Sequence, residues 1–504
     1  MTIKHFYHSY INDKKLSTIQ KLSILLILIG IALRIYHFFA NRSLWLDEAL
    51  LSNNIISRDF AGLLGPLDDR QIAPIGFLFF QKLSIILFGA NEYALRLFSL
   101  LCGIGSLPLF YFTIKKIADE KAAFLGLLFF VFGKYLLYYS HEAKQYNADL
   151  LAYLLILYFI YLKDLSKLNY QKLVGISLLG ALTVWFSHIS IILLSTLGSV
   201  IFIESLLKKD PKRIIKILVP CSIWLASIAA VYLLFLYNNS NEGIQQSVFA
   251  SIGYFPPSPF RVKDIPWLFD ITIHAIQYPL GTMSGVFILL LMFCGVFYAI
   301  KKRNYKVLLA GLPILVHLAI SYFKLYPFYG RFLLYTIVYS LILLSLGFKL
   351  LFSIKPPYGF FISLVASIAF MFAPAQSCLE RFNFEDIKPS ISYIEEQHED
   401  ENMLYVFYGA VYAYTFYENK YELPEETYFG KVYDFNAVRL TNELDELEKS
   451  ASTTGTWFLF SHISKEQKNQ FCKLIATRAT LIKSFELNGA SAYLYNFPDT
   501  VESK

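Results

Sequence analysis

Apolar segments close to 20 residues long recur through the first three quarters of the chain, and lysine and arginine gather between them. A helix needs about 20 apolar residues to cross a bilayer, and in lipid only helices and closed barrels satisfy every backbone polar group. Segments of this length favour helices over the short alternating strands of a barrel. With 56% hydrophobic and 16% charged residues, the composition excludes an ordinary soluble enzyme of this size. The sequence therefore predicts an all-α polytopic membrane bundle.

The basic stretches predict which loops face the cytoplasm, because cytoplasmic loops are enriched in lysine and arginine. The same rule explains the net charge of +7 without a nucleic acid partner. Residues 24–39 form a retained first span rather than a signal peptide, since Arg42 and Trp45 follow in place of a small-residue cleavage site. The predicted cytoplasmic residues are Lys4, Lys14, Lys15 and Lys21, then Lys115, Lys116 and Lys121, then Lys163, Lys167 and Lys172, then Lys208, Lys209, Lys212, Arg213 and Lys216, then Lys301, Lys302, Arg303 and Lys306, and finally Lys349 and Lys355. Between them we expect about eleven spans, near residues 22–40, 96–114, 122–139, 147–162, 173–187, 189–207, 214–236, 280–300, 306–323, 331–349 and 358–375.

One apolar segment, residues 74–89, does not fit this count. It is shorter than a full span, and a crossing here would place Lys115 and Lys116 outside. We therefore expect a juxtamembrane or re-entrant helix inside one long external loop, residues 41–93. Asp47, residues 140–147, residues 237–270 and residues 323–331 then all lie on the external side, where they can meet at one site.

The composition changes after Pro374, where charges become frequent and long apolar runs stop. We expect a helix over residues 384–397, strands over 403–408 and 456–460, and a helix over 465–477. The chain is thus divided into a membrane domain, residues 1–375, and a small soluble α/β domain, residues 376–504, which an odd number of spans places outside. The five cysteines form no CxxC or Cys/His cluster, so they predict no metal site.

The acidic pair Asp47-Glu48 follows the first span and leads into an apolar helix. Asp47 could simply cap the helix from Glu48 to about Ser57. Alternatively, an acid at the mouth of the bundle could take a proton from an attacking hydroxyl group. Spacing alone leaves both open.

A second polar cluster, residues 138–149, lies at the external ends of the third and fourth spans. If this segment is helical, Glu142, Tyr146 and Asp149 share one face. Charges at the entrance of a span either reach for water or serve a site. For Lys144 the alternative is a side chain that extends to water at the membrane surface. For the cluster as a whole, we favour a role in a binding site.

Three cations at external positions are candidates to bind an anionic leaving group. Arg96 and Arg331 open two spans, and Lys82 lies in the apolar helix of the first loop. Cations stabilise the negative charge that grows on a departing phosphate. Each can equally be an interfacial anchor. His188, between the fifth and sixth spans, is more typical of an interface histidine than of a catalyst.

These motifs, in this order, resemble the GT-C glycosyltransferases of the protein O-mannosyltransferase and lipid A aminoarabinose transferase type. The resemblance covers roughly residues 20–350. It rests on Asp47-Glu48, on Ala73-Pro74-Ile75-Gly76, on Ala94-Leu95-Arg96-Leu97, on Glu142-Ala143-Lys144-Gln145-Tyr146 and on Gly330-Arg331-Phe332. The chain departs from the mannosyltransferase pattern, a His-Pro-Pro type stretch with a lysine after its glycine, at Ile72, Ala73 and Phe77.

The resemblance implies an inverting transfer from a polyprenyl-phosphate-linked sugar to a glycan, lipid or protein acceptor, at the inner membrane of the cell. It implies Asp47 as the base with Glu48 in support, and Arg96, Lys144 and Arg331 as ligands of the phosphate or sugar. Adjacent carboxylates can also hold a divalent cation, so metal dependence stays open. A flippase or transporter for a lipid-linked sugar is the alternative function, although its charges would lie near the middle of the spans. A polymerase or ligase of another fold is a third.

Overall fold

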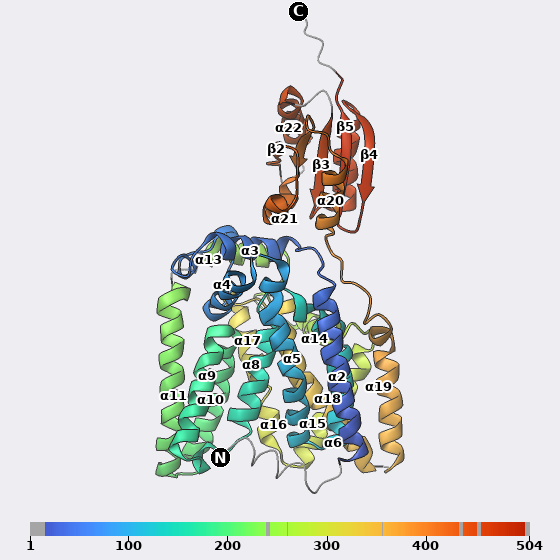
Figure 1. Ribbon diagram of the computed structural model, residues 1–504. Coiled ribbons are helices and arrows are strands. Elements are labelled where there is room, and N and C mark those ends of the chain that lie inside the picture. The colour runs from blue at the N-terminus through green and yellow to red at the C-terminus, as the bar shows by residue number, and fades with distance from the viewer. Residues whose placement is uncertain are drawn as a thin grey trace, which may run out of the picture.

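The computed structural model describes residues 16–237, 242–259, 261–354, 356–432, 437–450 and 455–498. Of the lysines predicted to be cytoplasmic, Lys4, Lys14, Lys15 and Lys355 lie outside these ranges. The chain forms a helical bundle with a small sheet domain at one end, next to α3 and α4 (Figure 1). The helices before the sheet domain are α2 (Thr18–Phe39), α3 (Leu46–Ser57), α4 (Ile75–Phe88), α5 (Glu92–Ile117), α6 (Glu120–Phe132), α7 (Lys134–Tyr138), α8 (Tyr146–Leu155), α9 (Tyr170–Phe186), α10 (Ile189–Leu207), α11 (Pro211–Val231), α13 (Glu242–Ser251), α14 (Ile265–Leu280), α15 (Gly285–Lys301), α16 (Tyr305–Leu309), α17 (Leu312–Tyr322), α18 (Ile337–Ile354) and α19 (Tyr358–Gln376).

Seven helices in the described ranges are long and apolar enough to cross a membrane, and nine spans result if two bent helix pairs each count as one. The bent pairs are Glu120–Phe132 with Lys134–His141, and Val262–Leu280 with Gly285–Lys301. Two shorter apolar helices, Tyr146–Tyr161 and Tyr170–Phe186, occupy the two remaining predicted positions. The helical, multi-pass membrane architecture is therefore confirmed, and α4 forms the short extra helix expected near residues 74–89.

Glycines let helices of the bundle approach closely, as is common in membranes. A side chain at Gly295 of α15 would collide with the backbone of Leu343 on α18, and one at Gly347 would collide with the backbone of Leu291. The α15–α18 contact therefore depends on the absence of a Cβ atom at both positions.

The basic stretches gather at the end of the bundle away from the sheet domain. Glu92, the first residue of α5, pairs with Lys388 beyond α19, whereas Lys115 and Lys116 lie in the last turn of α5. At that far end, Lys349 forms an ion pair with Asp119. Three further basic loops also contact one another there: Arg213 forms an ion pair with Asp164, and the Lys306 ammonium donates a hydrogen bond to the Lys163 carbonyl oxygen. The two ends of the bundle therefore differ in charge.

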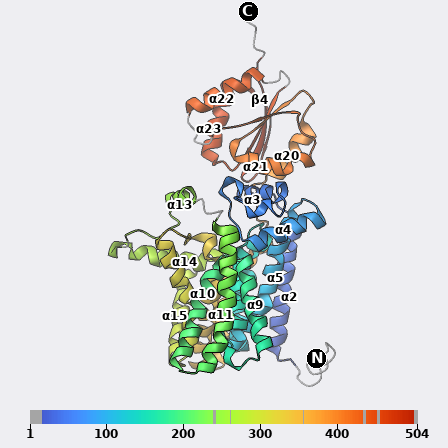
Figure 2. The same cartoon turned by 90° about the vertical axis from the view of Figure 1, so that its left-hand side faces the viewer.

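The sheet domain begins after α19 and stands above α3 in both views (Figures 1 and 2). Its sheet has the order β2-β1-β3-β5-β4, in which β1 is parallel to both β2 and β3, and β5 is antiparallel to β3 and β4. The small α/β domain expected from the sequence is confirmed, although the sequence predicts only two of its strands. Its elements are α20 (Ile387–Gln397), β1 (Met403–Val406), α21 (Val411–Tyr417), β2 (Glu426–Phe429), α22 (Ala437–Ser450), β3 (Thr456–Ser461), α23 (Lys465–Ala476), β4 (Thr480–Glu486) and β5 (Ala490–Asn496).

Candidate active site

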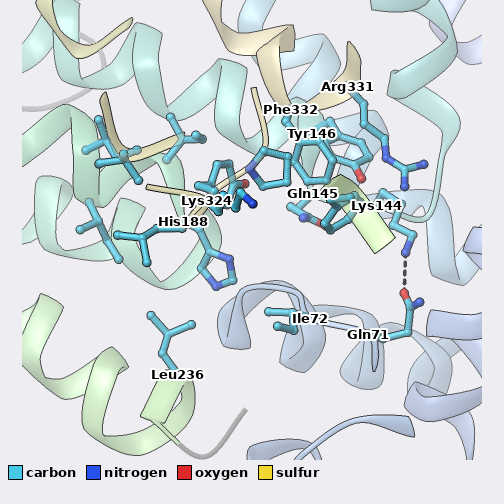
Figure 3. Close-up of a pocket in the computed structure, with 18 of the residues that line it drawn as sticks. Gln71, Ile72, Lys144, Gln145, Tyr146, His188, Leu236, Lys324, Arg331 and Phe332 are labelled. Atoms are coloured by element: carbon cyan, nitrogen blue, oxygen red, sulfur yellow. Dashed lines mark hydrogen bonds between the residues drawn. The ribbon is translucent and has the colours of Figure 1, made fainter. Parts of the chain in front are cut away.

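A cavity of about 390 Å³ lies between α3, the turn before α8 and the start of η8 (Gly330–Thr336). Figure 3 shows Arg331, Tyr146 and Phe332 together on one side of it, with His188 and Leu236 on another. Its polar lining residues are Asp47, Arg70, Gln71, Lys144, Gln145, Tyr146, His188, Lys324 and Arg331. The remaining lining is mainly apolar and includes Ile72, Ile191, Ile192, Leu236, Phe249, Phe255, Leu325 and Phe332. One cavity thus combines charged and apolar side chains in its lining.

Asp47 is held between two cations in this cavity. Its Oδ2 lies 2.8 Å from Arg331 Nη1, and its Oδ1 accepts a hydrogen bond from Lys144 Nζ at 3.1 Å. The expectation that Asp47 caps the helix is wrong, because α3 begins at Leu46 and its N-cap residue is Trp45. Burial alone would raise the pKa of Asp47, but the charges of Arg331 and Lys144 outweigh it and hold the pKa below its usual range.

Lys144 and Arg331 are fixed by neighbours as well as by Asp47. Lys144 Nζ also donates to Gln71 Oε1 at 2.8 Å, and its side chain is only 6% exposed, so it does not reach for water. The Arg331 guanidinium lies over the rings of Trp45, Tyr146 and Phe332, at 5.6 to 5.7 Å from their centres. Burial and the charge of Arg331 lower the pKa of Lys144 despite the opposing effect of Asp47.

Glu48 faces away from the cavity into a buried ion network. Its carboxylate accepts from Arg42 at 2.6 Å, from Arg96 at 3.0 Å and from the backbone amide of Ala143 at 2.8 Å. Arg96 also donates to the carbonyl oxygens of Arg42 and Ser43. Burial would raise the pKa of Glu48, but the two arginine charges lower it overall. The N–H groups of Arg96 are therefore used inside the protein, and Arg96 is not among the residues that line the cavity.

The structure separates the remaining predicted site residues. Glu142 has an extended backbone (φ −110°, ψ 137°) and α8 begins only at Tyr146, so Glu142 does not share a helix face with Tyr146 and Asp149. Tyr146 lines the cavity, whereas Asp149 lies further along α8 and accepts a hydrogen bond from Ser187 at 2.6 Å. Lys82 lies elsewhere and donates to the carbonyl oxygens of Ile55 and Ile56 in the last turns of α3. It therefore stabilises the end of α3 rather than lining the cavity.

Glu142 supports the wall of the site. Its Oε1 accepts hydrogen bonds from Trp45 Nε1 at 2.9 Å and from the Tyr138 hydroxyl at 3.0 Å. Burial and the charge of Glu48 raise the pKa of Glu142 to about 7, although Arg42 and Arg331 oppose the shift. Glu142 thus fixes the tryptophan ring that lies beside Arg331.

Arg70, Gln71, Gln145, His188 and Lys324 line the cavity but are not among the predicted site residues. Gln145 Oε1 and His188 Nε2 are buried and make no hydrogen bond to the described residues. Such atoms favour a polar ligand, since an unpaired buried polar group is costly. The sequence feature that could have pointed to Arg70 and Gln71 is the charged run Asp68-Asp69-Arg70, which lies in the loop predicted to be on the same, external side as Asp47.

The two adjacent carboxylates do not share a metal-binding position. Asp47 pairs with Arg331 and Lys144, whereas Glu48 pairs with Arg42 and Arg96. Within the described ranges, no group of three or more His, Cys, Asp or Glu side chains could hold a metal ion.

Residues 73–231 match the family model described as dolichyl-phosphate-mannose-protein mannosyltransferase. A search of curated proteins gives no match. Among solved structures, ArnT from Cupriavidus metallidurans in the apo state is 12% identical, with a TM-score of 0.54 over 94% of this chain and 97% of that one. The undecaprenyl-phosphate-bound structure of ArnT is 10% identical, with a TM-score of 0.56 and the same coverage.

The archaeal oligosaccharyltransferase AglB from Archaeoglobus fulgidus, in complex with an inhibitory peptide and a dolichol-phosphate, has a similar fold. It is 12% identical, with a TM-score of 0.53 over 98% of this chain and 74% of that one. The resemblance to GT-C proteins expected from the sequence is confirmed, by the family model over residues 73–231 and by the fold over nearly the whole chain.

Proposed function

We propose that this chain is a membrane glycosyltransferase that moves a sugar from a polyprenyl-phosphate donor to an acceptor hydroxyl, with inversion, on the external side of the membrane. The observation that carries the proposal is Asp47, held between Arg331 and Lys144 in a cavity whose lining is both charged and apolar. The ArnT structure holds undecaprenyl phosphate and the AglB structure holds a dolichol-phosphate, and both share this fold. A lipid phosphate has a charged group and an apolar chain, which match the charged and the apolar side chains of the cavity.

Arg331 and Lys144 are the ligands proposed for the donor phosphate. Phosphate becomes more negative as the sugar departs, and buried cations stabilise that charge in the transition state. The apolar lining, which includes Leu236, Phe249 and Leu325, would contact the start of the polyprenyl chain. The leaving phosphate is a weak base, so it requires no general acid.

Asp47 is the base proposed for the acceptor. Its carboxylate takes the proton of the attacking hydroxyl as that oxygen bonds to the anomeric carbon, and the bond from this carbon to the phosphate oxygen breaks on the opposite face. Without donor, Arg331 and Lys144 hold the pKa of Asp47 low and make it a weak base. A bound phosphate shares these cations and raises that pKa, so Asp47 becomes an effective base only when the donor is present.

The other residues near the site act on its shape. Glu48 and Arg96 hold the loop before α3 against the turn at Ala143, and Glu142 holds the Trp45 ring. Tyr146 packs beside Arg331 as part of the cavity wall. We assign Asp149 and Lys82 to helix positioning, through Ser187 and the end of α3.

The arrangement of the chain in the membrane follows from the distribution of charge. We propose that the basic end of the bundle is cytoplasmic, that residues 1–375 are the catalytic membrane domain, and that residues 376–504 form an external domain at the inner membrane of a cell. The acceptor is a glycan, a lipid or a protein.

The test is sugar transfer from a panel of radiolabelled polyprenyl-phosphate sugars to membrane extract, with and without chelator. We expect wild-type protein to label a product and Asp47→Asn to lose that activity. Asp68→Asn is the matched control, because Asp68 lies in the same loop with its side chain 70% exposed. Undiminished transfer by Asp47→Asn would reject the base, and no transfer by wild-type protein from any donor would reject the activity. Loss of transfer with chelator would add a metal to the mechanism.

A further inference from the structure

A second cavity, of about 400 Å³, lies between the first loop and the sheet domain. From the loop side it is lined by Leu46, Leu50, Asp69 and Arg70, and from the sheet domain by Phe407, Tyr408, Gly409, Tyr412, His462 and Gln467. Arg70 lines both this cavity and the one that contains Asp47. Leu46, which precedes Asp47 in α3, lines the second cavity. The two cavities therefore share Arg70, and each is lined by a residue of the first turn of α3.

The topology of the sheet places this cavity where α/β domains usually bind ligands. Phe407 directly follows β1, and His462 directly follows the parallel strand β3. The chain leaves β1 towards β2 on one side and returns to β3 on the other, so the carboxyl ends of β1 and β3 form a topological switch point. Open α/β sheets bind ligands in the crevice at such a point. Here that crevice faces α3.

Three of the seven non-glycine residues with positive φ in the described ranges line this cavity. Asp69 (φ 53°), Arg70 (φ 57°) and His462 (φ 53°) all adopt the left-handed region, which is unfavourable for residues other than glycine. The strained turn is held in place, because the Tyr412 hydroxyl donates to Asp69 Oδ1 at 2.8 Å. His462 Nδ1 lies 2.6 Å from Glu385 Oε1. Strained conformations that the surrounding structure maintains are a feature of binding sites.

We infer that this second cavity binds the acceptor, and that the acceptor presents a carbohydrate to it. The inference deepens the proposed function and rests on it. A sugar that occupies the crevice lies beside the first turn of α3, and one of its hydroxyl groups can reach Asp47 while the donor fills the other cavity.

The side chains of the cavity fit a sugar better than a peptide or a lipid tail. Tyr408 and Tyr412 offer aromatic faces for the C–H face of a sugar ring, and Asp69 and Arg70 offer planar polar groups for its hydroxyls. A peptide that binds by adding a strand would require an unpaired strand edge, but β1 and β3 both have neighbours on either side. A lipid tail would require a lining without charges.

The first part of the test identifies the acceptor chemistry and needs no variant. Membrane extract is treated with periodate, which cleaves vicinal diols of sugars, or with a protease, and each reagent is removed before radiolabelled donor and wild-type protein are added. We expect periodate to abolish labelling and the protease to leave it unchanged. Labelling that survives periodate overturns the inference, whether the acceptor then proves to be a protein or a lipid.

The second part locates the acceptor site. Tyr408→Ala removes an aromatic face that is 39% exposed, so it leaves the core of the domain intact. We expect the half-saturating concentration of extract to rise about tenfold, with transfer at saturation nearly unchanged. Ile482→Ala, at a 54% exposed position on the outer strand β4, is the control. Binding of polyprenyl phosphate without sugar should be equal in all three proteins.

An unchanged half-saturating concentration in both Tyr408→Ala and Tyr412→Phe overturns the inference while the proposed function stands. Failure of wild-type protein to transfer from any donor overturns both. If Tyr408→Ala also loses phosphate binding or unfolds at a lower temperature, Tyr412→Phe decides the question, since it keeps the ring and removes the hydroxyl that donates to Asp69.

Discussion

Arg331 and Asp47 form an ion pair of 2.8 Å although they lie in the last and first thirds of the bundle sequence. Lys144 reaches the other oxygen of the same carboxylate from the middle of the chain. The three charges are thus assembled only by the fold, and in the absence of donor they neutralise one another in part. A ligand phosphate could replace the Asp47 carboxylate as the partner of Arg331 and Lys144.

Asp47→Asn should bind polyprenyl phosphate at least as tightly as wild-type protein, because it removes an anion that competes for the cations. Arg331→Ala should bind it about 10- to 100-fold more weakly, as expected for the loss of a charge-assisted hydrogen bond worth roughly 1.5–3 kcal/mol. Equilibrium binding of the sugar-free lipid phosphate in detergent measures both. Weaker binding by Asp47→Asn would contradict the assignment of Arg331 and Lys144 to the phosphate.

Glu48→Ala should unfold at a much lower temperature than Asp47→Asn. Glu48 is fully buried, and its removal leaves the buried Arg42 and Arg96 without a carboxylate, which typically costs about 3–5 kcal/mol. Asp47 is partly exposed beside a cavity, so its replacement costs far less. Thermal unfolding in detergent compares the two adjacent positions directly. Equal melting temperatures would show that the buried network does not stabilise the fold.

Glu142 should make the protein less stable as the pH rises from about 4.5 to about 7. Because its folded-state pKa is raised to about 7, the folded protein keeps a proton that the unfolded chain releases in this range. The contribution is lost as the pH rises through the folded pKa and amounts to roughly 3 kcal/mol at most.

Glu142→Gln should remove this part of the pH dependence, which unfolding measurements between pH 4.5 and 7.5 would detect. The pKa values of Asp47 and Glu48 are lowered, so the stability that these two carboxylates contribute is lost only at a pH below this range. An identical pH dependence in wild-type protein and Glu142→Gln would reject the shifted pKa.

Glu385→Ala should slow transfer although Glu385 lies beyond the bundle. The Glu385 carboxylate accepts a hydrogen bond from the backbone amide of Leu46 at 2.9 Å, and α3 has no side-chain cap from its own N-cap residue. Loss of a helix cap costs about 0.5–2 kcal/mol, and here it would loosen the turn that carries Asp47. Glu385→Gln, which keeps an acceptor oxygen, should retain most activity. Glu380→Ala, at an exposed position nearby, is the control.

Hydropathy and charge predict the bundle well, because span length and basic loops report directly on the membrane. Three strands are missed. The edge strands β2 and β4 are mostly exposed or half-buried and lack the continuous apolar run of β1 and β3. β5 begins with Ala490-Ser491-Ala492, and alanine is a weak strand former. The sequence singles out Asp47, Lys144 and Arg331, which the fold brings together, because charges at the entrance of a span are costly to bury. The burial of Glu48 and the extended backbone at Glu142 depend on tertiary contacts, which spacing along the chain does not reveal.

The contact between Glu385 and Leu46 also means that α3 is synthesised well before the residue that caps it. The two residues are 339 positions apart, and at typical rates of synthesis the second follows the first by about 20–70 s. During that interval α3 and its carboxylate exist without their cap. A partly made or truncated chain therefore carries Asp47 without the cap on the first turn of α3, so newly inserted protein should transfer sugar more slowly until its last domain has folded.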